Sequence, residues 1–186
     1  MIINRTIWTP TLAWLGAAVA ALVLALAAPS ESDVMGRLPE VTVKRLDQQR
    51  VVIPSGFTAD RVLALVAYSK SHRADIQSWI QGLRLDQDSS IEWFKMPVLD
   101  DPGDEGARDA LERRLLAQLP PDGDRSRLVP VFTDRQAFIR AAGLSGPEHV
   151  SVLVLNRDGK VLARAEGRFD EAKAQALRET LLTQGD

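Results

Sequence analysis

The strongest constraint on the fold is a continuous apolar run, residues 62–67 (VLALVA). A run of this length without a polar residue is typical of a strand that is buried on both faces, as in a parallel sheet. A polar loop follows, and a second apolar segment occupies residues 91–99. Between these segments, four residues share one helical face: Ile76, Trp79, Ile80 and Leu83. We therefore predict a βαβ unit with two parallel strands and a right-handed crossover.

The chain beyond this unit predicts two helices around a short strand. The acidic segment at residues 100–106 predicts the start of one helix after it. Carboxylates at a helix N-terminus are stabilised by the helix dipole. Pro130 restricts the strand at residues 128–132 to a sheet edge or a strand end, and Thr133 or Asp134 can cap the next helix. The first helix is marked by four leucines: Leu111, Leu115, Leu116 and Leu119.

Two predicted hairpins and a last helix complete the plan. Residues 150–155 and 160–165 flank an Asp-Gly turn, which is a strong hairpin signal. Short alternations within residues 37–57 indicate a second hairpin outside the main sheet, and a helix begins at Asp170. The predicted fold class is α/β, with a mixed sheet formed by the βαβ unit and the closing β-hairpin, and with flanking helices.

Composition excludes several classes of function. Cysteine is absent from all 186 residues, which excludes disulfides, thiol nucleophiles, iron–sulfur clusters and dithiol redox chemistry. Only two histidines occur, so most imidazole-based metal centres are excluded as well. A net charge of −2 argues against a nucleic-acid partner, which requires a basic face. We expect no cofactor, because no phosphate-binding glycine loop or dinucleotide motif is present.

An uncharged apolar segment, residues 11–28, precedes the predicted domain. As a helix at about 1.5 Å per residue it would span roughly 27 Å, which is close to the hydrocarbon thickness of a bilayer. Arg5 precedes the segment, whereas Glu31 and Asp33 follow it. The positive-inside rule then places the C-terminal domain on the exported side, periplasmic or equivalent. We predict one N-terminal transmembrane helix that anchors the protein in the membrane.

A cleaved signal peptide is the alternative interpretation of this segment. Ala25-Leu26-Ala27 forms an A-x-A cleavage site, although the apolar run is longer than the usual ~7–15 residues of a signal peptide. The domain is exported in both cases. The predicted organisation is an anchor or signal peptide (residues 1–28), a polar tether (29–37) and one domain (38–186).

The candidate functional residues lie in two loops that the topology brings together. Ser71, His72 and Arg73 follow the first buried strand, and His149 and Val150 lie where the antiparallel hairpin strand begins. These strand ends share one sheet edge, where open α/β sheets bind ligands, so we expect a shallow groove there. We interpret it as a partner-binding groove, in which the Val150 backbone pairs with an extended segment and Arg73 holds a carboxylate.

A metal-binding protein or an enzyme that uses His72 and His149 is the alternative, with Asp75 as a third metal ligand. Nucleophilic catalysis has little support, because the sequence has no G-x-S-x-G elbow. The simplest interpretation is that both histidines are exposed loop residues. Three arginines of the leucine-bearing helix are interpreted as a solvated face: Arg108, Arg113 and Arg114.

The order of elements resembles the thioredoxin-like superfamily. Residues 62–80 (VLALVAYSKSHRADIQSWI) correspond to its central strand, active loop and following helix, and residues 149–167 (HVSVLVLNRDGKVLARAEG) correspond to its closing hairpin. Both redox hallmarks are missing. The CxxC position falls at residues 71–74, which read SHRA, and the usual proline before the hairpin is replaced near Val150.

Within that superfamily, the chain resembles a cysteine-less, membrane-anchored branch that includes the mitochondrial ATP synthase assembly factor family. The similar features are the N-terminal anchor, the helix start at residues 75–79, the step FTDRQAF at residues 132–138 and the hairpin turn at residues 155–159. The resemblance covers roughly residues 38 to 183. It implies a non-redox domain that is not an enzyme, binds a protein partner and, like a chaperone, assists assembly or maturation of a membrane complex.

Overall fold

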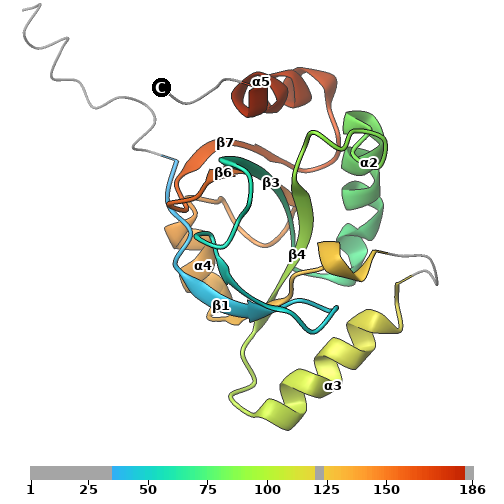
Figure 1. Ribbon diagram of the computed structural model, residues 1–186, viewed down its shortest axis with the longest axis vertical. Helices are drawn as coiled ribbons and strands as arrows, with labels where there is room; N and C mark the ends of the chain where they lie inside the picture. Colours follow the sequence, from blue (N-terminus) through green and yellow to red (C-terminus); the bar gives the residue numbers. More distant parts are fainter. Residues whose placement is uncertain (1–34, 120–123, 183–186) are drawn as a thin grey trace, which may run out of the picture. The chain divides into compact units, whose positions relative to one another are not determined.

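The computed structural model describes residues 35–119 and 124–182, whose centre is a five-stranded sheet (Figure 1). The strand order is β5-β4-β3-β6-β7. β4 pairs in parallel with β3 and β5, whereas β6 pairs antiparallel with β3 and β7. The strands are β3 (Arg61–Ala67), β4 (Trp93–Asp100), β5 (Val131–Thr133), β6 (Ser151–Asn156) and β7 (Val161–Glu166). The predicted mixed sheet is therefore confirmed, with β5 at its edge as Pro130 requires.

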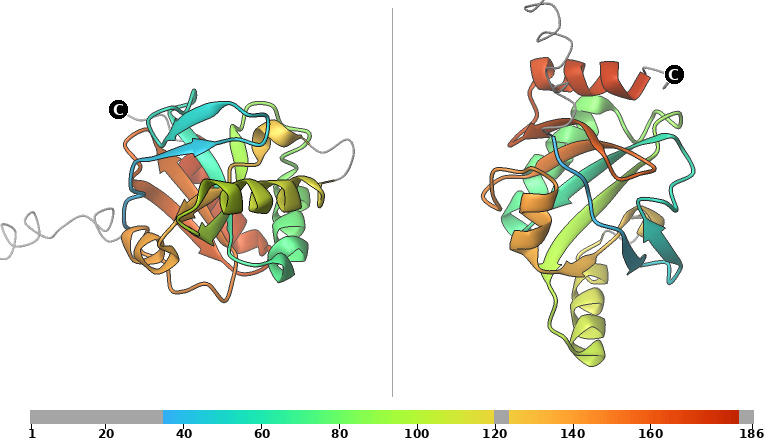
Figure 2. Two further views of the ribbon diagram at one scale, coloured as in Figure 1. Left: turned by 90° about the horizontal axis from the view of Figure 1, so that it is seen from below. Right: turned by 90° about the vertical axis from the view of Figure 1, so that its left-hand side faces the viewer.

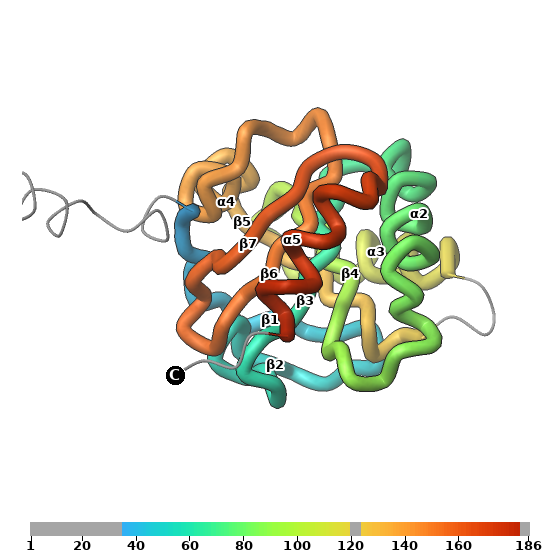
Figure 3. The backbone as a smooth tube through the Cα atoms, turned by 90° about the horizontal axis from the view of Figure 1, so that it is seen from above, coloured from blue at the N-terminus to red at the C-terminus, as the bar shows by residue number. Residues whose placement is uncertain are grey.

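One face of the sheet is covered by two helices, α2 (Arg73–Leu83) and α5 (Glu171–Leu182). Figure 3 shows α5 lying across β6 and β7. Trp79 of α2 is fully buried, and its indole Nε1 donates a hydrogen bond of 2.8 Å to the Gly167 carbonyl. This bond joins α2 to the end of β7, so the helix is fixed by both packing and polar contact.

The other face is covered by α4 (Arg135–Ala141) and by a separate two-stranded hairpin, β1 (Val41–Lys44) and β2 (Arg50–Ile53). β3 contributes to both layers, since Leu63 and Leu65 face α2 while Val62, Ala64 and Val66 face α4. All five side chains are inaccessible to solvent. The apolar run of the sequence is thus a strand buried on both faces, as predicted.

Local signals in the sequence mark where several elements begin. Asp134 caps α4 by accepting a hydrogen bond of 2.9 Å from the Ala137 amide. Gly159, with φ of 78°, forms the turn between β6 and β7. Two short 3-10 turns, η2 (Lys70–His72) and η3 (Arg125–Arg127), precede α2 and β5. The βαβ unit, the closing hairpin and the outer hairpin are all confirmed.

The N-terminal anchor predicted at residues 11–28 lies outside the described residues. Across residues 35–119 and 124–182, no helix is long and apolar enough to cross a membrane.

The helix α3 (Glu105–Leu116) is held differently from the others and projects from the sheet in Figure 2. Its only buried residue is Glu112, whose Oε2 lies 3.3 Å from the Lys44 ammonium of β1. Asp104 caps the helix by accepting 2.8 Å from the Ala107 amide, and Arg108 donates two hydrogen bonds to Asp101. The four leucines that predict this helix are only partly buried.

Candidate functional site

The structure builds the candidate site around a buried histidine between β3 and α2. His72 is only 6% exposed, and its ring nitrogens contact two backbone groups. Nδ1 accepts a hydrogen bond of 3.3 Å from the Tyr68 amide, and Nε2 lies 3.2 Å from the Glu148 carbonyl. Because Nδ1 accepts from an amide, the proton is on Nε2, which donates to Glu148. The neutral imidazole therefore connects the two loops directly.

This contact confirms that the two predicted loops meet at one edge of the sheet. The interpretation of His72 as an exposed loop residue is wrong, because its ring is needed to satisfy two backbone groups and is enclosed between the loops. Val150 is fully buried, and its carbonyl accepts a hydrogen bond of 2.9 Å from the Gly167 amide. The predicted site therefore divides into two buried residues, His72 and Val150, and three exposed ones: Ser71, Arg73 and His149.

The ring of Tyr68 packs beside the ring of His72. The two ring centres lie 6.2 Å apart, edge to face at 86°. Burial raises the pKa of the Tyr68 phenol to about 12, and the neighbouring Ser151 hydroxyl opposes this shift only in part. The phenol stays neutral at any ordinary pH, so it acts as a structural group and not as a base.

The arrangement gives no support to metal or acid–base chemistry at His72. Both of its ring nitrogens are used by backbone groups, so a metal ion or a proton acceptor role would require one of these bonds to break. In the described part of the chain, no three His, Asp or Glu side chains are grouped as a metal site would need. The His72 ring instead holds the two loops together through these backbone hydrogen bonds.

A cavity of about 510 Å³ adjoins the loop and extends between α2, β4 and α3. The sequence pattern did not predict this cavity, and the interpretation of Arg114 as part of a solvated face is incomplete, because this residue lines the cavity. Lys95 is the sequence signal that could have indicated it, since it is the one charged residue among residues 93–99 of β4. The neighbouring Lys70 and Arg73 also line the cavity, so Arg73 belongs to both the loop and the cavity.

Comparison with solved structures identifies the fold. BsSco, a member of the Sco family of cytochrome c oxidase assembly proteins, matches with a TM-score of 0.52 at 14% identity, over 80% of this chain and 95% of its own. The N-terminal domain of PilB from Neisseria gonorrhoeae matches with a TM-score of 0.52 at 16% identity, over 84% and 95%. The exposed lipoprotein thioredoxin Etrx1 of Streptococcus pneumoniae matches with 0.50 at 12% identity, over 76% and 99%.

These matches show that the chain has a thioredoxin-like fold, as the sequence resemblance implied. No family profile matches the sequence, and no curated protein matches it either. Identities this low establish the fold and not the activity. The finer resemblance to the ATP synthase assembly branch stays a prediction.

Proposed function

We propose that this protein is a non-redox thioredoxin-like binding domain, tethered to a membrane by residues 11–28 and exported to the far side. Its partner is a protein with an extended acidic segment, which binds at the loop surface formed by Ser71, Arg73 and His149. The domain assists assembly or maturation of a membrane complex.

The observation that carries this proposal is the His72 bridge between the two loops. In the sequence resemblance, residues 71–74 occupy the CxxC position, and this chain has no thiol with which to perform redox chemistry there. The position nevertheless carries a buried imidazole that fixes both loops through backbone hydrogen bonds. A loop pair that is held in place but has no reactive group supports recognition rather than catalysis.

The charges on the loop surface support an acidic partner. Arg73 is exposed at the first residue of α2, and the exposed Lys70 lies one helical turn before it. The N-terminus of a helix adds a favourable potential for a carboxylate at the same place. Glu148 is the one exposed carboxylate in the adjoining loop, residues 145–150.

The role in assembly is supported by two resemblances. BsSco is described as belonging to a family of cytochrome c oxidase assembly proteins, and it shares this fold. The sequence itself resembles a membrane-anchored branch with an ATP synthase assembly factor. BsSco is described as having a disulfide switch, which this chain cannot form because it has no cysteine, so the role that we propose in assembly is a non-redox one.

Site-specific crosslinking in native membranes tests the partner proposal. A photoreactive benzoylphenylalanine replaces Ser71 in the full-length chain, and the matched control places it at Ser89, which is also an exposed serine. We expect one discrete protein adduct from position 71 and none from position 89. The adduct should disappear when Arg73 and His149 are replaced by alanine. Equal adducts from both positions, or an adduct that survives the double substitution, would place the interaction elsewhere.

Membrane tethering has an independent test. We expect the full-length protein to remain in the membrane fraction after carbonate washing, because an apolar segment of 18 residues can span the bilayer. Recovery of a soluble chain that begins near Ala28 would instead establish a cleaved signal peptide.

The non-redox character of the domain has its own test. In an insulin reduction assay the protein should show no turnover, because the reaction requires a thiolate.

A further inference from the structure

The cavity beside α3 has an apolar floor and a wall formed by the partly buried side chains of α3. Leu65 and Met96 are fully buried beneath it, and Ile76 and Leu128 are nearly so. The opposite wall is α3, which contributes no fully buried apolar side chain. A volume of about 510 Å³ falls in the range of about 300–1,000 Å³ typical of ligand pockets, which are mainly apolar with a few placed polar groups. The cavity thus has the size and lining of a small-molecule site.

The charged residues that line the cavity are all basic. They are Lys70, Arg73, Lys95 and Arg114. No Asp or Glu lines the cavity, and none forms a salt bridge with these four residues within the described part of the chain. A group of unpaired cations around an apolar space favours a ligand that is both apolar and negatively charged.

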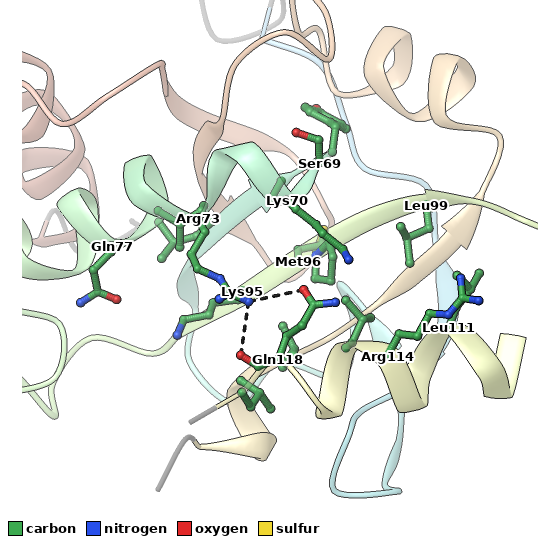
Figure 4. A pocket seen from close by; sticks show the side chains of 18 residues that line it. Ser69, Lys70, Arg73, Gln77, Lys95, Met96, Leu99, Leu111, Arg114 and Gln118 are labelled. Atoms are coloured by element: carbon green, nitrogen blue, oxygen red, sulfur yellow. Dashed lines mark hydrogen bonds between the residues drawn. The ribbon is translucent and has the colours of Figure 1, made fainter. Parts of the chain in front are cut away.

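Lys95 and Arg73 show how the cations are held. Burial lowers the pKa of the Lys95 ammonium, an effect that Asp86 and Asp124 oppose from outside the lining. The Lys95 ammonium also lies 5.8 Å from the centre of the Trp93 ring. Arg73 donates to the backbone carbonyl of Gln118 at 3.2 Å, and Figure 4 shows Lys70, Arg73 and Gln118 converging between the loop and α3. An anion bound here would meet cations from both sides of the cavity.

We propose that this cavity binds an amphiphile with an unbranched apolar chain and one anionic head, either a carboxylate or a lipid phosphate. The chain lies between the floor residue Met96 and the leucines of α3, among them Leu111 and Leu115. The head binds Lys70 and Arg114, and the N-terminus of α2 adds a favourable potential beside it. This inference goes beyond the proposed function, because a protein partner at the loop surface does not require an occupied cavity.

Calorimetric titration of the full-length chain in phosphatidylcholine nanodiscs tests the ligand class. The probes are decanoate, decyl phosphate and decyltrimethylammonium, each below its micelle concentration, and empty nanodiscs provide the background. We expect saturable binding of the two anions with a stoichiometry of one and no saturable binding of the cation. Because the attraction is partly electrostatic, the affinity should fall as salt is raised.

Matched variants locate the binding within the molecule. Arg113 and Arg114 are exposed neighbours on α3, and only Arg114 lines the cavity. Leu115 and Leu116 are partly buried neighbours, and only Leu115 lines it. We expect Arg114→Gln and Leu115→Gln each to weaken decanoate binding about tenfold, which corresponds to about 1.4 kcal/mol, while Arg113→Gln and Leu116→Gln leave it unchanged. Lys70→Gln should weaken it to a similar extent.

Three outcomes would overturn this proposal. They are binding no stronger than that of empty nanodiscs, equal binding of the cationic probe, and equal losses from the cavity variants and their matched neighbours. A benzoylphenylalanine at Leu115 that crosslinks a protein instead of taking up decanoate would assign the cavity to a partner segment. Native mass spectrometry of protein released from membranes distinguishes the two sources, since a bound free carboxylate and a bound phospholipid differ in mass.

Discussion

The helices α2 and α3 border the same cavity, but they are held to the molecule in different ways. α2 has 11 residues and buries four apolar side chains, Ile76, Trp79, Ile80 and Leu83. α3 has 12 residues and buries only Glu112. It is held by a cap, a salt bridge to Lys44, a pair of hydrogen bonds to Asp101 and its partly buried leucines. The segment just after it is joined to α2 by the hydrogen bond from Arg73 to the Gln118 carbonyl.

This difference divides the functional region into a fixed side and an adjustable side. Side chains in a close-packed core cannot shift without loss of many contacts, so α2 holds the loop surface in one position. Partly exposed ion pairs and caps contribute less each, so we infer that α3 moves at a smaller cost in free energy than α2 does. We infer that recognition of a protein partner belongs to the fixed side, and that ligand uptake depends on the adjustable one.

The largest expected effect is the loss of the Trp79 side chain from α2. We expect Trp79→Ala to lower the free energy of unfolding by about 3–5 kcal/mol, since it leaves a large cavity and removes the hydrogen bond to the Gly167 carbonyl. The matched change in α3, Leu115→Ala, should cost about 1 kcal/mol, because that side chain is only partly buried. Urea unfolding followed by circular dichroism measures the first change, and amide hydrogen exchange in α3 measures the second, because α3 opens separately from the core. Similar losses would mean that α3 is packed as firmly as α2.

Titration of Tyr68 tests the fixed side by an independent measurement. Burial raises its pKa to about 12 in the folded protein, against about 10 in the unfolded chain. The neutral phenol therefore stabilises the fold fully below pH 10, and this contribution is lost as the pH rises through 12. Tyr68 is the only tyrosine, so tyrosinate absorbance reports on it alone.

Phe at position 68 provides the control for that titration. Tyr68→Phe should remove the part of the stability loss between pH 10 and 12 that the phenol causes, while the stability at neutral pH changes little. A midpoint near pH 10 in the native protein would show that the base of the loop is open to solvent.

The α2 side could be predicted from the sequence because its signals are strong and local. The apolar run of β3 has the length of a strand and is followed by a polar loop, and the spacing of Ile76 to Leu83 is that of one helical face. The Asp-Gly turn does the same for the closing hairpin, where Gly159 adopts a positive φ. These elements are stabilised by burial, and burial leaves a clear pattern in the sequence.

The candidate site could be predicted only in part, because it depends on contacts between distant residues. Sequence topology placed His72 near residue 149, but it could not show that the imidazole is buried against the Glu148 carbonyl, 76 residues away. The cavity was missed for the same reason. Leu115 of α3 has the spacing of a core residue, and whether it fills the interior or borders a cavity depends on how closely α3 approaches β4.

The salt bridge between Lys44 and Glu112 is expected to have an intermediate effect. Lys44→Met leaves the buried Glu112 carboxylate without its nearest cation and should cost about 1–2 kcal/mol, between the values for exposed and for fully buried pairs. The double variant Lys44→Met, Glu112→Leu removes both charges and should recover most of that loss. A double variant as unstable as the single one would show that Glu112 contributes through other contacts. Amide hydrogen exchange in α3 measures each variant, because this pair holds α3 against β1.

The smallest expected effect tests most directly whether α3 is attached more weakly than a helix that packs on the core. It compares two aspartate caps of the same kind, one on α3 and one on α4. Asp104 accepts 2.8 Å from the Ala107 amide at the start of α3, and Asp134 accepts 2.9 Å from the Ala137 amide at the start of α4. Replacement of either by alanine removes about 1 kcal/mol. α4 buries Phe138 and Ile139, so its first turn is coupled to the core, and Asp134→Ala should lower the global free energy of unfolding by about that amount.

α3 has no such coupling, so Asp104→Ala should leave the global free energy of unfolding nearly unchanged and affect only the helix itself. Amide hydrogen exchange in α3 should accelerate about fivefold, which is the equilibrium factor that corresponds to about 1 kcal/mol, while exchange in α2 stays the same. If Asp104→Ala lowers the global stability as much as Asp134→Ala, then α3 unfolds together with the core and the cavity has a fixed wall. A fixed wall would require a ligand to enter without displacement of α3, so the cap comparison also decides how the cavity fills.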